Sequence, residues 1–342
     1  MTRGFHNHIG GDRENSPWLD LSRIRGYWVF AARLIVLLLV MPVAGFAADA
    51  DIVIVLSNDT REYRQISEQI IKGVQASSFS DKRFRVVVHN RLEASDRGLL
   101  THAEVAAVIP VGIKALKAMI DLPARSPLYA VFVPRLSYEK ILRASQADSP
   151  PDEARKITAL FLDQPIERQM RLAKLLNPEF TRAGILLGEN TRFLDRELDE
   201  TSRMLKLKIV RISPAGSRQI VSSLSRAYRK IDFLLTVFDP DIISRKSAKQ
   251  ILYLSYNHRL PVIGYSRAMV KAGALAAVYS ESSQIGRQAA ETLLQMLEQG
   301  FDELPDPVYP AHFQVSCNIS VMNYFHLETV CPDETFLRQG GE

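Results

Sequence analysis

Short apolar runs that alternate with stretches of helical periodicity constrain this chain more than any other feature. The run "DIVIVLS" at 51–57 has the length of a buried strand, and "YRQISEQIIKGVQ" after it spaces its apolar residues three and four apart. The alternation continues through "FRVVVHN", "VAAVIPVG", "IKALKAMI" and "LYAVFVP". Such a succession of strand, helix and strand predicts a parallel sheet with helices on both faces.

The second half of the chain repeats this rhythm. The runs "KITALFLD", "RAGILLGEN", "LKIVRIS" and "IDFLLTVFD" each precede a helical segment, and "LPVIGYS" and "GALAAVYS" complete the set. Between the halves lies "RASQADSPPDEARK", residues 143–156, whose Ser, Pro and charged residues are typical of a crossover between domains. We therefore predict an α/β fold of two doubly wound parallel-sheet lobes.

The predicted division of the chain has four parts. They are a signal peptide at 1–47, an N-terminal α/β lobe at 48–150, a C-terminal α/β lobe at 151–280, and a crossover helix with a C-terminal segment that completes the lobes at 281–342. A chain of 342 residues is long enough for two lobes that each bury a core.

The first 47 residues have the layout of a secretory signal peptide. Arginines at 23, 25 and 33 precede the apolar run 34–40, and small residues follow, which predicts cleavage after Ala47. The alternative is an uncleaved membrane anchor, but Arg33 would cost about 3 kcal/mol near the centre of a membrane helix. We expect cleavage and a location in the periplasm.

The charge of the chain falls once the leader is removed. Residues 1–47 hold five arginines and three acidic residues, so their loss lowers the net charge from +5 to +3. Nucleic acid is therefore not an expected partner. The same cleavage removes Trp18 and Trp28, the two tryptophans of the chain.

Cysteine and histidine usage indicates neither a metal site nor a cofactor. Cys317 and Cys331 are the two cysteines, and in an oxidising compartment we expect a disulfide, with two buried or free thiols as the alternative. The histidines after residue 47 are scattered singly, which gives no zinc-binding spacing. No Gly-rich phosphate loop and no GxSxG sequence follows a predicted strand, so we expect no enzyme activity.

Each apolar run of the second half ends in a polar or small cluster. In open parallel sheets, ligands bind outside the carboxyl ends of the strands, so these clusters are expected to open on one edge. The clusters are Asp163-Gln164, Glu189-Asn190-Thr191, Asp239-Pro240-Asp241, Tyr265-Ser266 and Ser280-Glu281-Ser282-Ser283. In the first half, Asn58, Thr60 and Tyr63 follow the first strand, and Gly112 with Ile113 follows "VIPV".

The order and spacing of several segments resemble one known family. "ITALFLDQPIERQMRLAKLLNPEFTRAGILL", "LPVIGYSRAMVKAGALAAVYSESSQIGRQAAETLLQML" and "LPDPVYPAHFQVSCNISVMNYF" are similar to the ABC-transporter substrate-binding proteins of the tryptophan/tyrosine type. The residues that match the pattern of this family are Pro165, Gly184, Pro261, Gly264, Gly273, Gly286, Arg287 and Asn318. The resemblance covers residues 155–328 well and 51–145 weakly.

The resemblance implies a periplasmic-binding-protein type I fold, with two lobes joined by crossover strands and hinge closure around a small ligand. It also implies that the chain, as a monomer, delivers this solute to an ABC permease in the inner membrane. Known members bind aromatic amino acids among other ligands, so an amino acid or related carboxylate is the candidate. A sensory binding protein that signals to a membrane kinase or cyclase is the alternative.

A zwitterionic ligand needs a carboxylate for its ammonium, hydroxyls or backbone N–H groups for its carboxylate, and an apolar wall. Asp239 falls where the family has an Asp at a strand end and is the first candidate for the ammonium or for a sugar-type hydroxyl; capping of the following helix is the alternative. The predicted ligand set is Asn58, Thr60, Tyr63, Gly112, Ile113, Gln164, Asn190, Asp239, Tyr265, Ser266 and Ser280.

Three further residues leave alternatives open. Lys114 either faces the cleft, which favours an acidic ligand, or is a solvated helix residue. Arg135 is available to pair with a ligand carboxylate or to form a salt bridge between the lobes. Tyr279 stands where the family has Gly and would narrow or fill the cleft.

Overall fold

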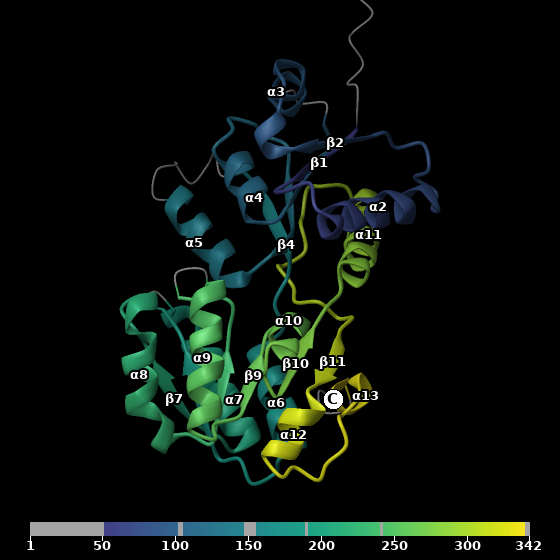
Figure 1. Cartoon of the computed structure of the whole chain (residues 1–342). Helices are drawn as coiled ribbons and strands as arrows, with labels where there is room; N and C mark the ends of the chain where they lie inside the picture. The colour runs from purple at the N-terminus through teal and green to yellow at the C-terminus, as the bar shows by residue number, and fades with distance from the viewer. Residues whose placement is uncertain (1–50, 102–104, 147–154, 189–190, 240–241, 339–342) are drawn as a thin grey trace, which may run out of the picture. The chain divides into compact units, whose positions relative to one another are not determined.

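Two sheets organise the structure. A computed structural model describes residues 51–338 except 102–104, 147–154, 189–190 and 240–241, so the predicted leader and Asn190 lie outside the described residues. Residues 48–342 form one compact unit. We call the elements around the five-stranded sheet the first lobe and those around the six-stranded sheet the second lobe (Figure 1).

The first sheet is parallel and has the strand order β2-β1-β3-β4-β5. Its strands are β1 (Ile52–Leu56), β2 (Phe84–Val88), β3 (Ala107–Val111), β4 (Leu128–Val133) and β5 (Ile157–Phe161). Its helices are α2 (Arg61–Gln75), α3 (Ala94–Thr101), α4 (Ile113–Ile120), α5 (Arg135–Gln146) and α11 (Ser282–Gln299), with a 3₁₀ turn at His89–Arg91.

The second sheet has the order β11-β10-β9-β8-β6-β7, and only β11 runs antiparallel to its neighbour. Its strands are β6 (Arg182–Leu186), β7 (Lys208–Ile212), β8 (Phe233–Thr236), β9 (Val262–Gly264), β10 (Ala276–Tyr279) and β11 (Gln314–Cys317). Its helices are α6 (Ile166–Leu176), α7 (Asp195–Leu205), α8 (Ile220–Ala227), α9 (Arg245–Asn257), α10 (Arg267–Lys271), α12 (Ile319–Tyr324) and α13 (Glu334–Arg338). Three 3₁₀ turns are η3 (Arg192–Leu194), η4 (Ser217–Gln219) and η5 (Tyr228–Lys230).

Strand β1 explains why the central strands read as continuous apolar runs. Ile52, Ile54 and Leu56 point into a core shared with α2 and α11, whereas Val53 and Val55 point into the core beneath α4 on the other face. Because successive side chains of a strand point to opposite faces, a strand covered on both sides needs apolar residues throughout.

The position of β5 corrects the predicted boundary between the lobes. The predicted crossover was 143–156, and "KITALFLD" was assigned to the second lobe. Strand β5 instead pairs with β4 in the first sheet, so the chain passes to the second lobe at 162–165. A buried apolar run carries no signal for the sheet it joins, because the pairing is made with a strand distant in sequence.

The chain crosses between the lobes twice more. Residues 280–281 connect β10 to α11, which packs against α2 in the first lobe. The segment after α11 returns along β5, where the N–H of Val308 donates to the carbonyl of Ala159, and residues 309–313 lead back to β11. Three short connections therefore join the lobes.

Gly286 sets the distance between α11 and α2. Its neighbours are residues of α2, not of the sheet. A Cβ at Gly286 would lie 2.7 Å from the Cβ of Gln69 and 2.9 Å from the carbonyl oxygen of Ile66. The two helices approach so closely because this position has no side chain.

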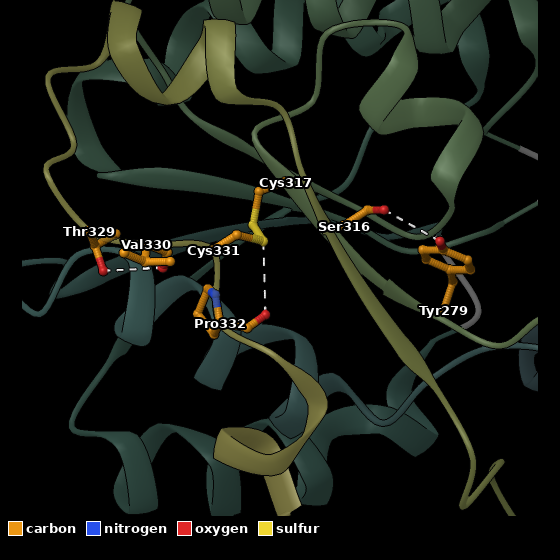
Figure 2. Close-up of a disulfide and its surroundings, with 7 residues drawn as sticks. All are labelled: Tyr279, Ser316, Cys317, Thr329, Val330, Cys331 and Pro332. Carbon is orange, nitrogen blue, oxygen red and sulfur yellow. Dashed lines mark hydrogen bonds between the residues drawn. A yellow bond between two sulfur atoms is a disulfide. The ribbon is translucent and has the colours of Figure 1, made fainter.

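A disulfide between Cys317 and Cys331 fastens the C-terminal segment to the second lobe (Figure 2). It joins the end of β11 to the chain that leads into α13, where Leu337 is buried in the core next to α6. Cross-linking two points of the chain reduces the freedom of the unfolded state. No free cysteine occurs in the part of the chain that the structure describes.

Candidate functional site

The carboxyl ends of the strands of both sheets lie at the crossovers. Strand β5 ends at Phe161 and β10 ends at Tyr279, and each leads into a connection to the other lobe. In a parallel sheet all strands end at the same edge, so the ends of β1, β3 and β4 accompany β5, and those of β6, β8 and β9 accompany β10. This topology provides the candidate site.

Gln164 and Ser280 bond to each other and tie the three crossovers together. Gln164 Nε2 donates to Ser280 Oγ over 2.8 Å, and Ser280 Oγ donates to the carbonyl of His312 over 2.6 Å. Both side chains are buried. Their predicted ligand role stays a prediction, but in this structure their polar atoms connect the crossover segments.

Arg135 forms the interlobe salt bridge that was one of its two alternatives. Its Nη1 lies 2.5 Å from Glu197 Oε2 and donates to the hydroxyl of Tyr309 over 2.6 Å. Glu197 Oε1 also accepts the N–H of Ile166, the first residue of α6. The guanidinium lies over the rings of Phe193 and Tyr309, at 5.6 and 5.5 Å from their centroids. Helix α5 of the first lobe is thereby held to α7 of the second.

Asp163 lies beside this salt bridge in the first crossover. Its Oδ1 accepts the N–H of Arg135 over 2.8 Å and so caps the start of α5. Burial raises the pKa of the Asp163 carboxyl to about 6, although the N–H of Arg135 and the charge of its guanidinium act in the opposite direction. The crossover therefore contains a carboxyl that titrates near neutral pH.

At the end of β1, the polar candidates make local contacts. Asn58 is exposed, and its Oδ1 accepts the N–H of Asp59. Thr60 is the residue before α2, but its hydroxyl donates to Glu62 Oε2 over 2.7 Å and caps no helix N–H. Tyr63 is half-buried, and burial raises the pKa of its phenol.

Gly112 lies at the end of β3, close to β4 and to the end of β1. Its φ is +87°, and its N–H donates to the carbonyl of Val131. This N–H is therefore already paired and does not face a ligand carboxylate. A Cβ here would lie 2.7 Å from both Ser57 Oγ and Tyr63 Cε1. Gly112 precedes α4 and has no side chain to cap it. Ser57 Oγ caps α4 instead, because it accepts the N–H of Ala115 over 2.8 Å. Ile113 is half-buried, and Lys114 is exposed.

Phe132 is a candidate site residue that the sequence did not indicate. Its φ is +62° within β4, where the pairing with β5 shifts register between Val131 and Val133. A left-handed backbone is rare for a bulky residue, and bulges often re-aim a side chain. The ring of Phe132 meets that of Tyr63 edge-on, with centroids 5.6 Å apart. "LYAVFVP" reads as a regular strand and contains no signal for the bulge.

Asp239 is buried at the end of the second lobe's central strand. Its Oδ2 accepts the N–H of Gly188 over 3.1 Å, which places it between the loops after β6 and β8. Capping was the alternative for Asp239, but α9 begins at Arg245 and Ser244 is its cap, accepting the N–H of Ser247. Asp239 thus lies at the strand-end edge, where we predicted it.

Tyr265 and Ser266 follow β9. Ser266 Oγ accepts the N–H of Met269 and caps α10. Tyr265 is half-buried, burial raises the pKa of its phenol, and its ring meets Phe238 edge-on with centroids 5.5 Å apart. Phe238 was missed although it is adjacent to Asp239, because the run "LLTVFD" reads as strand core throughout.

Tyr279 does not stand alone at the strand end. Its hydroxyl lies 3.3 Å from Ser316 Oγ (Figure 2). It also lies 3.5 Å from Gln314 Oε1, and both partners are on β11. Its side chain therefore packs over the neighbouring strand.

Among the described residues, no group of three His, Cys, Asp or Glu side chains is placed to hold a metal ion. None of the described helices has both the length and the apolar character of a membrane span.

Two lobes built on largely parallel sheets and joined by three crossovers, with polar and aromatic residues at the strand ends, have the architecture of the periplasmic-binding-protein type I fold. A family model described as ABC transporter substrate binding protein matches residues 141–315, just over half of the chain. The chain belongs to this family, which confirms the resemblance seen in the sequence. The family is one of binding proteins and not of enzymes.

Solved structures support the fold. The ABC domain in complex with L-Trp from Streptococcus pneumonia has a TM-score of 0.56 at 14% identity, covering 86% of this chain and 99% of that one. A ligand-free, open substrate binding protein with adhesive properties from Clostridium difficile has a TM-score of 0.59 at 14% identity, covering 82% and 96%. A conserved domain protein from Vibrio cholerae has a TM-score of 0.56 at 15% identity, covering 85% of this chain and 98% of that one. The sequence matches none of the curated proteins.

Proposed function

We propose that this protein is the periplasmic solute receptor of an ABC importer and that it binds an amino acid or related carboxylate with an aromatic or flat apolar side group. One observation carries the ligand class. Each lobe has an edge-to-face aromatic pair at its strand-end edge, Tyr63 with Phe132 and Phe238 with Tyr265. All four rings are only half-buried, so each pair keeps surface for a ligand.

The polar part of the ligand is assigned to groups beside these rings. Asp239 follows Phe238 directly and supplies a buried carboxylate suited to an ammonium group. The ligand is held between the lobes, and bending at 162–165, 280–281 and 309–313 closes them around it. The closed receptor then delivers the solute to a permease of the inner membrane.

The test is a thermal-shift and titration experiment on residues 48–342. This chain has no tryptophan, because both lie in the leader, so the emission of added L-Trp reports its own binding. The L-Trp complex of the Streptococcus pneumonia protein makes aromatic amino acids the first ligands to test. A bound ligand at about a hundred times its Kd adds roughly 2.7 kcal/mol to stability.

We expect aromatic amino acids to raise the midpoint and Asp239→Asn to weaken their binding while the fold is kept. The matched control is Asp199→Asn, which changes the same group on the exposed face of α7. Binding of aliphatic carboxylates or sugars in preference to aromatic compounds would reject the proposed ligand class. Equal affinity of the Asp239 variant and the control would reject the role of Asp239.

A further inference from the structure

A second surface of the molecule is strongly cationic. Helices α8 and α9 pack against each other on the second lobe, with turns at their ends (Figure 1). We call their exposed cations the basic face: Arg218, Arg226, Arg229, Lys230, Arg245, Lys246, Lys249 and Arg259. The sequence contains no Asp or Glu in 201–231 or in 242–280. The face is therefore of one sign along both helices.

The charges of the basic face are not neutralised by the described part of the chain. None of its eight cations forms a salt bridge with a described residue, whereas Arg182 pairs with Asp232 and Arg211 pairs with Asp195 nearby in the same lobe. Uncompensated cations on neighbouring helices add to one positive potential, which attracts anionic surfaces.

Large side chains that suit a membrane interface lie among these cations. Tyr253 of α9 is 69% exposed, and Tyr256, one turn further along, is 54% exposed. Val221 of α8 is also exposed. Tyrosine is enriched where water meets lipid headgroups, because its ring is apolar and its hydroxyl is polar. Against lipid headgroups, the apolar rings would leave water while the hydroxyl groups stay in a polar environment.

A hollow opens where the two helices begin. It is lined by Arg218, Val221, Ser244, Lys246, Ser247 and Gln250. Two cations, hydroxyl groups and an amide surround it, and this donor set matches the oxygens of a phosphodiester. The hollow shares no lining residue with the predicted ligand set, although α8 and α9 follow β7 and β8 and so begin at the strand-end edge of the second sheet.

We propose that the basic face docks on the surface of an anionic phospholipid membrane, with a headgroup phosphate in the hollow between α8 and α9. A positive face complements either a negative patch on a protein or a sheet of negative headgroups. The exposed tyrosines among the cations favour the headgroups, where each cation near the surface contributes about fivefold to binding. Docking there holds the receptor at the membrane that contains its permease.

The experiment measures flotation of residues 48–342 with vesicles of phosphatidylcholine alone or rich in phosphatidylglycerol. The test variant is R218E/K246E/K249E, and the matched control is K72E/R97E/K117E, which reverses one Arg and two Lys that are exposed on the first lobe. Both variants carry the same net charge. Thermal unfolding checks that each is folded.

We expect binding to the phosphatidylglycerol vesicles at low salt, loss at high salt, and a decrease on the order of a hundredfold for the test variant but not for the control. Tyr253→Ser should weaken binding at both salt concentrations. Equal losses in the two charge-reversal variants would reject the basic face as the docking surface. Failure of the unchanged chain to float would reject the membrane and leave an acidic protein as the partner.

Discussion

Nη1 of Arg135 on α5 lies 2.5 Å from Oε2 of Glu197 on α7, and this ion pair joins the two lobes beside the first crossover. Both side chains are mostly buried, at 23% and 20% exposure. An ion pair in such a position resists opening of the lobes at that point, because separating the partners leaves each half-buried and unpaired. Electrostatic attraction between α5 and α7 therefore helps to fix the relative position of the lobes at the first crossover.

Glu197→Gln should lower the free energy of unfolding by about 1 kcal/mol, since it removes the charge but keeps an oxygen for the N–H of Ile166. Urea denaturation measures this change. In a double-mutant cycle with Arg135→Gln, the double variant should lose less stability than the sum of the losses of the two single variants. Arg196 and Glu200, an exposed pair on α7, serve as the control and should show no coupling.

Asp163 predicts an unusual dependence of stability on pH. Its pKa is about 6 in the folded protein and 3.8 in the unfolded chain, so the folded state binds this proton more tightly. The contribution to stability is complete below the unfolded pKa and is lost as pH rises through about 6. Between pH 7 and pH 5, wild type should gain about 1 kcal/mol relative to Asp163→Asn. Parallel pH profiles of the two proteins would contradict the assignment.

Gly286→Val should destabilise the protein by roughly 2 kcal/mol, because the added atoms meet backbone and Cβ atoms of α2 and force the helices apart. Chemical denaturation measures the loss. Gly98→Ala is the control: it lies within α3 with open space around it and should stabilise that helix by a few tenths to about 1 kcal/mol. A Gly286 variant as stable as wild type would mean that α2 and α11 shift without cost.

The disulfide predicts a loss of about 3 kcal/mol when both cysteines become Ser, from the 14-residue separation of Cys317 and Cys331. Thermal unfolding with and without reductant measures it. Reductant should lower the stability of wild type and leave the double Ser variant unchanged. A similar response of both proteins to reductant would indicate that the bond contributes nothing.

Phe132→Gly separates backbone strain from ligand contact. Glycine accepts a positive φ freely, so relief of about 1 kcal/mol of strain should offset most of the lost contact with Tyr63. Stability should then stay near that of wild type, while the affinity for an aromatic amino acid falls. Scanning calorimetry measures the stability, and titration calorimetry measures the affinity. An unchanged affinity would remove Phe132 from the proposed site. Phe79→Gly, a half-buried ring away from the strand ends, is the comparison for stability.

The alternation of apolar runs and helical segments was sufficient to predict the α/β class and two lobes, and the order and spacing of particular segments carried the resemblance to the family. The alternation also placed Asp239 and Tyr265 just after strands and Tyr63 at the start of the helix that follows β1, because the runs of a parallel sheet end at the same edge. These properties are local or periodic. They depend on which residues follow one another and need no knowledge of distant partners.

The tertiary structure decided which residues meet. Strand β5 joined the first sheet because it pairs with β4, and Gln164 bonded Ser280 because two crossovers run side by side. The bulge that turns Phe132 toward Tyr63 arises from a register shift between strands. Arg135 pairs with Glu197 and not with a ligand carboxylate, the other partner that its chemistry allowed. The choice depends on the distance between the charged groups, and for residues far apart in sequence only folding fixes that distance.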